Sequence, residues 1–174
     1  ITAIDGSSEL IKRAKRRKIK NVEFIESLYE EFEPEEKFDT IVLSDILEHV
    51  ENPVDLLKKA QNWLKANGRI IIISPNANSL HRQIGVLSDM LKDVHDLNLT
   101  DKKVGHRRVY DHKLLEKDLK KAKLKIKKSD GFFLKPLSDS QMESLPDEVV
   151  KAFYQIGKTL PKDLLALLYL VCKK

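Results

Sequence analysis

The sequence is poor in cysteine and has no long hydrophobic run. Cys172 is the single cysteine, so no disulfide forms within the chain, and a reducing, cytoplasmic setting is expected. The longest apolar run extends only from Leu164 to Cys172, far short of the roughly 20 residues that a helix needs to cross a bilayer. No basic segment followed by an apolar stretch opens the chain, which argues against a secretory signal. We therefore expect no membrane span.

Charge of one sign is not in large excess either. The chain has 32 Lys and Arg against 27 Asp and Glu, a net charge of +5. This mild excess suits an anionic small molecule and does not call for a nucleic acid partner. A length of 174 residues with 41% hydrophobic residues fits one compact domain with its own core. We expect a single domain over residues 1–174, and the sequence leaves its oligomeric state open.

Apolar segments alternate with amphipathic ones along the first half of the chain. Strands are predicted at 1–4, 22–25, 38–44 and 69–76, and two closing strands at 124–134 and 164–172. The strands at 38–44 and 69–76 are apolar on successive residues, which is typical of strands covered on both faces. Helices are predicted after Ser7 or Ser8, from Pro53 to Asn67-Gly68, over 80–91, after Asp111 and over 142–156. Strand, helix and strand with short connections predict parallel βαβ units, and hence an α/β fold with helices on both faces of the sheet.

Polar or small residues follow each of the four predicted parallel strands. The exits are Asp5-Gly6, Glu26-Ser27-Leu28, Ser44-Asp45 and Ser74-Pro75-Asn76. In open parallel sheets, ligands bind beyond the carboxyl ends of the strands. Asp5 is placed to accept two hydrogen bonds from a ribose diol. By itself it fits a nicotinamide cofactor equally well, and the alternative is that it only caps the following helix.

Three titratable residues crowd the end of the third strand. Asp45, Glu48 and His49 stand at i, i+3 and i+4, so on one helical turn they share a face. They could hold a divalent ion, with His106 as a distant fourth ligand. Two alternatives stay open: His49 is a general base near an acceptor, or the group is polar lining. In each case we expect these side chains to face a wet cleft.

A second polar group lies between the fourth strand and the helix after Asp111. Residues 76–108 break the βα rhythm and predict a mobile lid over the acceptor site. This segment carries His81, Arg82, His106, Arg107 and Arg108. Arginine forks suit phosphate or carboxylate groups. Simple exposure to solvent is the alternative for Arg107 and Arg108.

Three stretches carry a family resemblance. The segments "ITAIDGSSELIKRAK", "FDTIVLSDILEHVENPVDLLKKAQNWLKANGRIIIISPN" and "GHRRVYDHKLLEKDLKKAKL" together resemble class I S-adenosylmethionine-dependent methyltransferases, in particular the ubiquinone-type and sugar-modifying group. The pairing of "SPNANSLHRQIG" with "GHRRVYD" is similar to methyltransferases of surface-polysaccharide and nucleotide-sugar pathways.

The resemblance implies a Rossmann-like, doubly wound sheet of strand order 3-2-1-4-5-7-6, mostly parallel with an antiparallel C-terminal strand. It also implies that Asp5 binds the cofactor's ribose, that Gly6, Ser27 and Leu28 lie at its adenine, and that Ser44 and Asp45 lie at its methionine end. The family's first strand and Gly-rich loop, which should precede Ile1, are not present in this sequence. We therefore expect a chain truncated at the N-terminus, with a missing strand between those at 1–4 and 38–44.

The resemblance implies transfer of a methyl group from S-adenosylmethionine to a hydroxyl or amine. The expected acceptor is a small anionic molecule such as a nucleotide-linked sugar. His49 and His106 are the expected catalytic residues, and the expected acceptor-binding residues are Asn76, His81, Arg82, Arg107 and Arg108. One alternative is a metal-dependent RNA 2′-O-methyltransferase, since the small-RNA enzymes show a similar acid-x-x-Glu-His pattern and a later histidine. The other is a methyltransferase-like domain that only binds a partner.

Overall fold

The computed structural model describes all residues from Ile1 to Lys174, and these form two compact units. The first comprises Ile1–Lys37 and the second Phe38–Lys174. No helix has both the length and the apolar composition that crossing a bilayer requires.

The first unit is one parallel βαβ motif. Strand β1 (Thr2–Asp5) pairs in parallel with β2 (Glu23–Glu26), and Asp5 lies opposite Glu26 in the register. Helix α1 (Ser8–Arg16) connects them and buries Ile11. It begins where the sequence predicts, because the Ser7 hydroxyl accepts a hydrogen bond of 3.3 Å from the Leu10 amide, which satisfies one of the free donors at the helix start.

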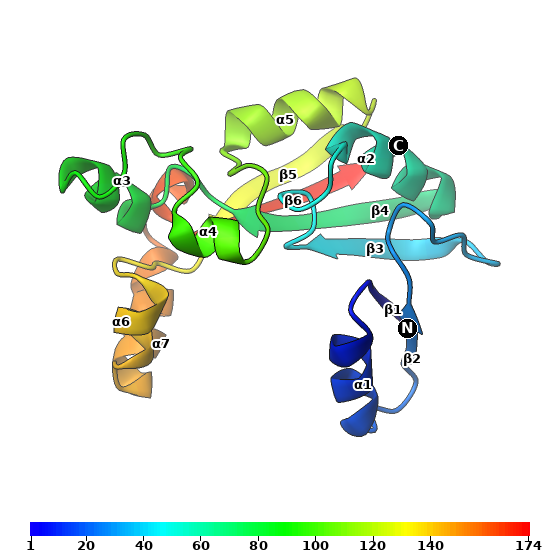
Figure 1. The fold of residues 1–174 in the computed structure, drawn as a ribbon. Coiled ribbons are helices and arrows are strands. Elements are labelled where there is room, and N and C mark those ends of the chain that lie inside the picture. The colour runs from blue at the N-terminus through cyan, green and yellow to red at the C-terminus, as the bar shows by residue number, and fades with distance from the viewer. The chain divides into compact units, whose positions relative to one another are not determined.

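The second unit is built on a four-stranded mixed sheet (Figure 1). Its strands are β3 (Phe38–Ser44), β4 (Leu64–Pro75), β5 (Lys125–Phe132) and β6 (Leu167–Lys173), in the order β3-β4-β6-β5. Strand β3 is parallel to β4, whereas β6 is antiparallel to both β4 and β5. The predicted α/β class and the antiparallel C-terminal strand are therefore confirmed. Strands β1 and β2 form a separate two-stranded sheet.

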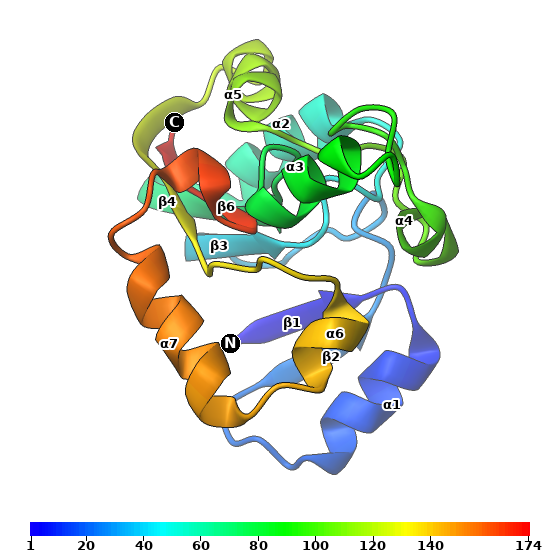
Figure 2. The same ribbon diagram turned by 90° about the vertical axis from the view of Figure 1, so that its left-hand side faces the viewer.

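Helices α2 (Pro53–Trp63) and α5 (His112–Lys121) cover one face of this sheet. Side chains on that face are fully buried, among them Leu57 and Leu115 of the helices and Ile70, Ile72, Leu168 and Leu170 of the strands. Their neighbours Ile71 and Ile73 point the other way and are only half-buried. The side chains of β4 therefore alternate between buried and half-buried, although its isoleucines are apolar at every position. On the other side of the sheet lie α6 (Asp139–Glu143) and α7 (Asp147–Gly157), towards the end of β5 (Figures 1 and 2).

Several element boundaries differ from the sequence-based prediction. Helix α2 ends at Trp63 instead of Asn67-Gly68, because Leu64 already pairs with Phe38 as the first residue of β4. The helix expected over 142–156 is split into α6 and α7, since Pro146 at the N-cap of α7 interrupts it. Residues 76–108 contain α3 (Leu80–Leu87), which is shorter than the predicted helix over 80–91, and the short α4 (Leu99–Lys103). A 3-10 turn, η1 (Lys162–Leu164), precedes β6.

Candidate functional site

The first unit gathers four of the predicted cofactor-binding residues at the carboxyl end of β1 and β2. Asp5 is half-buried there, and its Oδ1 accepts a hydrogen bond of 2.7 Å from the Ser7 amide. The other carboxylate oxygen, Oδ2, makes no hydrogen bond within the chain. Burial, followed by the charge of Asp5, raises the pKa of Tyr29 to about 12. Asp5 therefore braces the start of α1 and still has an oxygen available for a ligand.

Gly6 follows Asp5 at a point of close approach. A Cβ atom at Gly6 would lie 2.9 Å from Cδ2 of Leu28, nearer than real Cβ contacts allow. Leu28 is 52% exposed although it is a large apolar side chain, and its carbonyl accepts a hydrogen bond of 3.0 Å from the Ser27 hydroxyl. The carboxyl end of β1 and β2 thus combines the carboxylate of Asp5, a glycine at position 6 and the exposed apolar side chain of Leu28. These are the features that a ribose and a flat base require, and the assignment of Asp5, Gly6, Ser27 and Leu28 remains a prediction.

The second unit places the other candidates in the turn after β3. Asp45 has a left-handed φ of 53°, a conformation that Asp adopts more readily than most residues. Its amide donates to Ile73 O at 3.0 Å, and its Oδ2 accepts from the Ser44 hydroxyl at 3.0 Å. This change of backbone direction separates Asp45 from the turn that carries Glu48 and His49. Residues 45–50 form a turn and no helix, so the single shared helical face expected from the i, i+3, i+4 spacing is wrong, and Asp45 is not in the group that Glu48 and His49 form with His106.

Glu48 is fully buried, which corrects the expectation that this group faces a wet cleft. The exposed fraction of Glu48 is 0%. Its Oε2 accepts a hydrogen bond of 3.0 Å from the Ser74 hydroxyl at the end of β4, whereas its Oε1 is buried without a hydrogen-bond partner. Burial raises the pKa of Glu48 to about 7, against the lowering effect of the Ser74 hydrogen bond and the Arg108 charge. The adjacent strand ends β3 and β4 thus meet at this carboxyl group.

His106 joins Glu48 and His49 although it is far from them in the sequence. The Arg107 amide donates to Glu48 O at 2.8 Å, which pins the end of the 76–108 segment to the turn after β3. As a result, the rings of His49 and His106 meet edge to face with centroids 4.7 Å apart. Burial and the neighbouring His106 lower the pKa of His49. One candidate ligand atom from each of Glu48, His49 and His106 lies within 4.8 Å of the others.

Asp101 supports this cluster and was missed by the sequence analysis. Its Oδ1 lies 3.2 Å from His106 Nδ1, and its Oδ2 lies 3.1 Å from the Arg82 guanidinium. Asp101 is only 8% exposed. Its one signal in the sequence is the Asn98-x-x-Asp101 spacing of a capping box at α4, which the structure contains. That pattern predicts a helix start and says nothing about a distant histidine.

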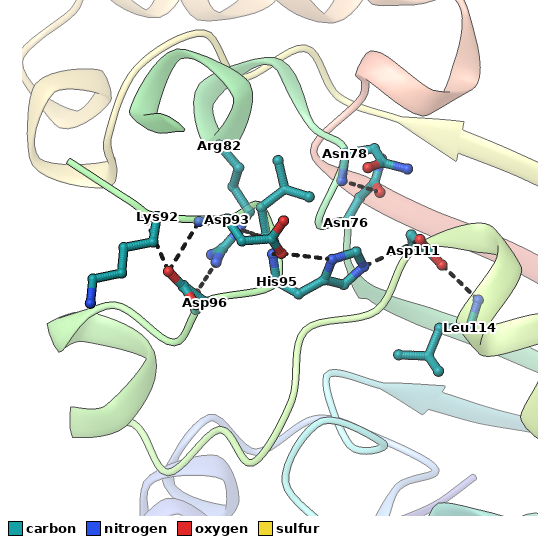
Figure 3. A network of polar contacts seen from close by, with 10 residues as sticks. Asn76, Asn78, Arg82, Lys92, Asp93, His95, Asp96, Asp111 and Leu114 are labelled. Carbon is teal, nitrogen blue, oxygen red and sulfur yellow. Dashed lines mark hydrogen bonds and ion pairs between the residues drawn. The ribbon is translucent and has the colours of Figure 1, made fainter. Parts of the chain in front are cut away.

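Three of the predicted acceptor-binding residues are occupied by backbone contacts. Arg82 is 4% exposed and donates to Val94 O at 2.6 Å and to Asp96 O, as Figure 3 shows for Asp96. Arg108 donates to three carbonyls of the turn after β3, those of Leu47, Val50 and Glu51. The Asn76 amide donates to Asp163 O and Leu165 O. These contacts argue for structural roles for Arg82, Arg108 and Asn76, and their binding of an acceptor remains a prediction.

The remaining two candidates, Arg107 and His81, line an open groove of about 1450 Å³. Arg107 is exposed, and Lys92 and Lys102 also line the groove. Burial, followed by the charge of Lys135, lowers the pKa of His81 to about 4. On the wall of the groove, His95 bridges Asp93 and Asp111 with contacts of 3.2 Å each (Figure 3). Arg107, Lys92 and Lys102 therefore give the groove positive charge. Arg107 directly follows His106 in the sequence.

The fold is similar to solved methyltransferase structures. An S-adenosylmethionine-dependent methyltransferase from Mesorhizobium loti matches with a TM-score of 0.64 at 12% identity, over 99% of this chain and 79% of that one. The plantazolicin methyltransferase BpumL in complex with SAH matches with a TM-score of 0.61 at 20% identity, over 99% and 66% of the two chains. The DhpI-SAM-HEP complex matches with a TM-score of 0.59 at 16% identity, over 99% and 67%. At these identities the likeness establishes the fold.

The chain spans about two thirds of the length of BpumL and DhpI. No curated protein matches the sequence. The family assignment rests on a match to a family model, and the matched residues extend from β1 through most of β5. The model of the methyltransferase domain matches residues 1–131, so the chain belongs to the methyltransferase domain family, the enzyme class that the sequence predicts.

Proposed function

We propose that this methyltransferase domain binds S-adenosylmethionine and transfers its methyl group to a hydroxyl or amine of a small anionic acceptor, such as a nucleotide-linked sugar. The family supports the reaction class. Solved structures of similar fold contain SAH or SAM, namely the BpumL and DhpI complexes, which supports the choice of cofactor. The observation that carries the proposal is Asp5, a half-buried carboxylate at the end of β1 with one oxygen free for a ligand.

The residues around Asp5 fit an adenosine. A ribose diol donates two hydrogen bonds, and a carboxylate accepts such a pair with charge assistance. At Gly6 the space of a Cβ is taken by Cδ2 of Leu28, so Leu28 packs directly against the backbone at the end of β1. The exposed Leu28 offers an apolar surface to the base, and Ser27 supplies the adjoining polar edge. All of these contacts come from the first unit.

The second unit supplies the groups suited to the acceptor. Arg107 presents an exposed guanidinium on a groove that Lys92 and Lys102 also line. Such a site attracts a phosphate or carboxylate. The Arg107 amide donates to the Glu48 carbonyl, which ties Arg107 to the turn of Glu48 and His49, although His49 and His106 do not themselves line the groove. In the proposed complex the acceptor extends from Arg107 to His49 and His106. These two histidines then assist loss of the acceptor's proton.

The bound cofactor supplies an electrophilic methyl group on a sulfonium. Transfer requires that the acceptor oxygen or nitrogen approach that carbon in line with the carbon–sulfur bond, with water excluded. As the new bond to the methyl carbon forms, the carbon–sulfur bond breaks with its electron pair on sulfur. The acceptor loses its proton towards the Glu48, His49 and His106 group, so charge balances over the reaction.

Replacement of Asp5 tests the proposal. Calorimetric titration of S-adenosylmethionine into the full chain should show affinity weakened about 10- to 150-fold by Asp5→Asn, the loss of one charge-assisted contact. Glu9→Gln removes the same charge from the exposed face of α1 and should leave the affinity unchanged. Equal affinities for Asp5→Asn and wild type would rule out the ribose contact. A wild-type chain that binds no S-adenosylmethionine would overturn the proposed function itself.

A further inference from the structure

We infer that Glu48, His49 and His106 form a binding site for a divalent transition-metal ion. Ion binding by these residues is independent of the proposed function, whereas the catalytic use of the ion rests on it. The inference is carried by four features of the cluster: its ligand types, its spacing, an unpaired buried oxygen, and the partners behind each ligand.

The spacing is close to that of a coordination shell. One carboxylate oxygen of Glu48 and one ring nitrogen each of His49 and His106 lie within 4.8 Å of one another. Metal–ligand bonds of about 2.0–2.2 Å place neighbouring ligands roughly 3–3.5 Å apart. Small rotations of the two half-buried imidazoles, which approach Glu48 from separate segments, close the remaining gap. Asp45 lies outside this group, so the ligand set differs from the one expected from sequence.

The buried oxygen of Glu48 indicates that something is missing from its surroundings. Glu48 is 0% exposed, and its Oε1 is buried without a hydrogen-bond partner. Leaving a carboxylate oxygen buried and unsatisfied is costly, and native chains seldom keep such an atom without a function. A cation bound between Glu48, His49 and His106 would give this oxygen a partner.

Each of the three residues also has a partner that orients it from behind. Ser74 donates to Oε2 of Glu48, and Asp101 holds Nδ1 of His106. The Gly105 backbone forms a hydrogen bond with the His49 ring, and Gly105 itself adopts φ 85°, a conformation that suits glycine. Metal-binding histidines commonly donate their second ring nitrogen to a carboxylate or carbonyl. His49 and His106 have this arrangement, and His106 keeps Nε2 for an ion.

The ligand set points to a class of ion and to a role. Two imidazoles and one carboxylate suit Zn²⁺, Fe²⁺, Co²⁺ or Mn²⁺ and leave coordination positions open. An acceptor hydroxyl bound at an open position becomes more acidic. The hydroxyl's proton then passes to solvent water, its oxygen forms the bond to the methyl carbon, and the sulfur leaves with the electron pair of its bond. With the ion bound, His49 and His106 serve as ligands, and solvent water takes the acceptor's proton in place of these histidines.

Titration with Co²⁺ tests the site without reference to activity. The full chain, first stripped of ions with a chelator, should bind one Co²⁺ and develop the visible absorption bands of nitrogen coordination. His106→Asn and Glu48→Gln should each weaken binding at least 10-fold. His95→Asn, a histidine outside the cluster, should bind as the wild type does. Circular dichroism establishes that each variant is folded, and His106→Asn, a half-buried position, serves if Glu48→Gln does not fold.

The outcomes separate this inference from the proposed function. Absence of one-to-one binding by the wild type, or equal binding by folded His106→Asn, would overturn the metal site. Calorimetry with S-adenosylmethionine in the presence of chelator measures the cofactor alone. Ion binding without cofactor binding would uphold the metal site and remove the proposed function, whereas methyl transfer that persists in chelator would remove the catalytic role of the ion.

Discussion

His106 and Asp101 are joined by a 3.2 Å contact between Nδ1 and Oδ1, and this contact decides which ring nitrogen of His106 remains for other partners. Asp101 cannot turn away easily. Its second oxygen is ion-paired with Arg82 at 3.1 Å and accepts the Asn98 amide at 3.0 Å. A chain of buried contacts from α3 therefore orients a histidine that faces His49.

Asp101→Asn is expected to release this orientation. The amide keeps the size of the side chain but carries no charge, so it holds the Nδ1–H tautomer of His106 less firmly. Nitrogen chemical shifts of His106 should show a mixture of tautomers, and Co²⁺ affinity should fall about 10- to 100-fold. Asp89→Asn, at an exposed position with φ 59° that Asn accepts, is the matched control. A single unchanged tautomer in Asp101→Asn would contradict the role assigned to Asp101.

Arg82→Leu is expected to loosen residues 92–101. Arg82 contacts the backbone at Val94 and Asp96 and the carboxylate of Asp101, and its loss leaves Asp101 buried without its ionic partner. Breaking a buried pair from one side costs about 3–5 kcal/mol. Hydrogen exchange of the 92–101 amides should become faster, and the free energy of unfolding should fall.

Arg107→Leu removes an exposed arginine of the same segment and should leave this exchange unchanged. The experiment also tests the lid predicted over residues 76–108. If residues 76–108 act as a lid, they must open in the ligand-free chain, and opening must break the Arg82 contacts. Amides at 93–106 that exchange as slowly as those of β4 in the wild type would speak against it.

His81 is expected to make stability depend on pH in the acidic range. Its pKa is lowered from 6.5 to about 4, mainly by burial, so the folded chain favours the neutral ring. Below pH 6.5 the unfolded chain takes up the proton first, and the free energy of unfolding falls until about pH 4. With about 1.36 kcal/mol per pKa unit, the loss is at most about 3 kcal/mol.

The measurement is the free energy of unfolding of wild type and His81→Asn across pH 4 to 6.5. The slope should be shallower for His81→Asn, which lacks the titrating ring. His95→Asn, which removes an exposed histidine (40% side-chain exposure), controls for the loss of an ordinary one. Parallel curves for wild type and His81→Asn would show that the buried ring does not contribute.

The positions of several candidate residues could be predicted from the sequence, whereas their roles stay predictions. Asp5, Ser44 and Ser74 stand at the ends of apolar runs, and strands β1, β3 and β4 end at these residues or next to them. Glu48 and His49 are adjacent in the sequence, so their proximity required no tertiary information. His106 was predicted to join them, and the structure brings its ring to 4.7 Å from that of His49.

The sequence alone determined the order and type of most elements, because apolar periodicity, Ser7, Asn52-Pro53 and Asp111 act within one or two helical turns. The tertiary structure decided which polar groups are buried and which residues they contact. Arg82 and Arg108 look like anion-binding arginines in the sequence, yet they donate to carbonyls of segments folded against them. Glu48 is buried and contacts the Arg107 backbone and Ser74, which come from two other segments of the chain. Such partners lie 12 to 61 residues apart, and no local pattern encodes a contact that depends on where the whole chain places both residues.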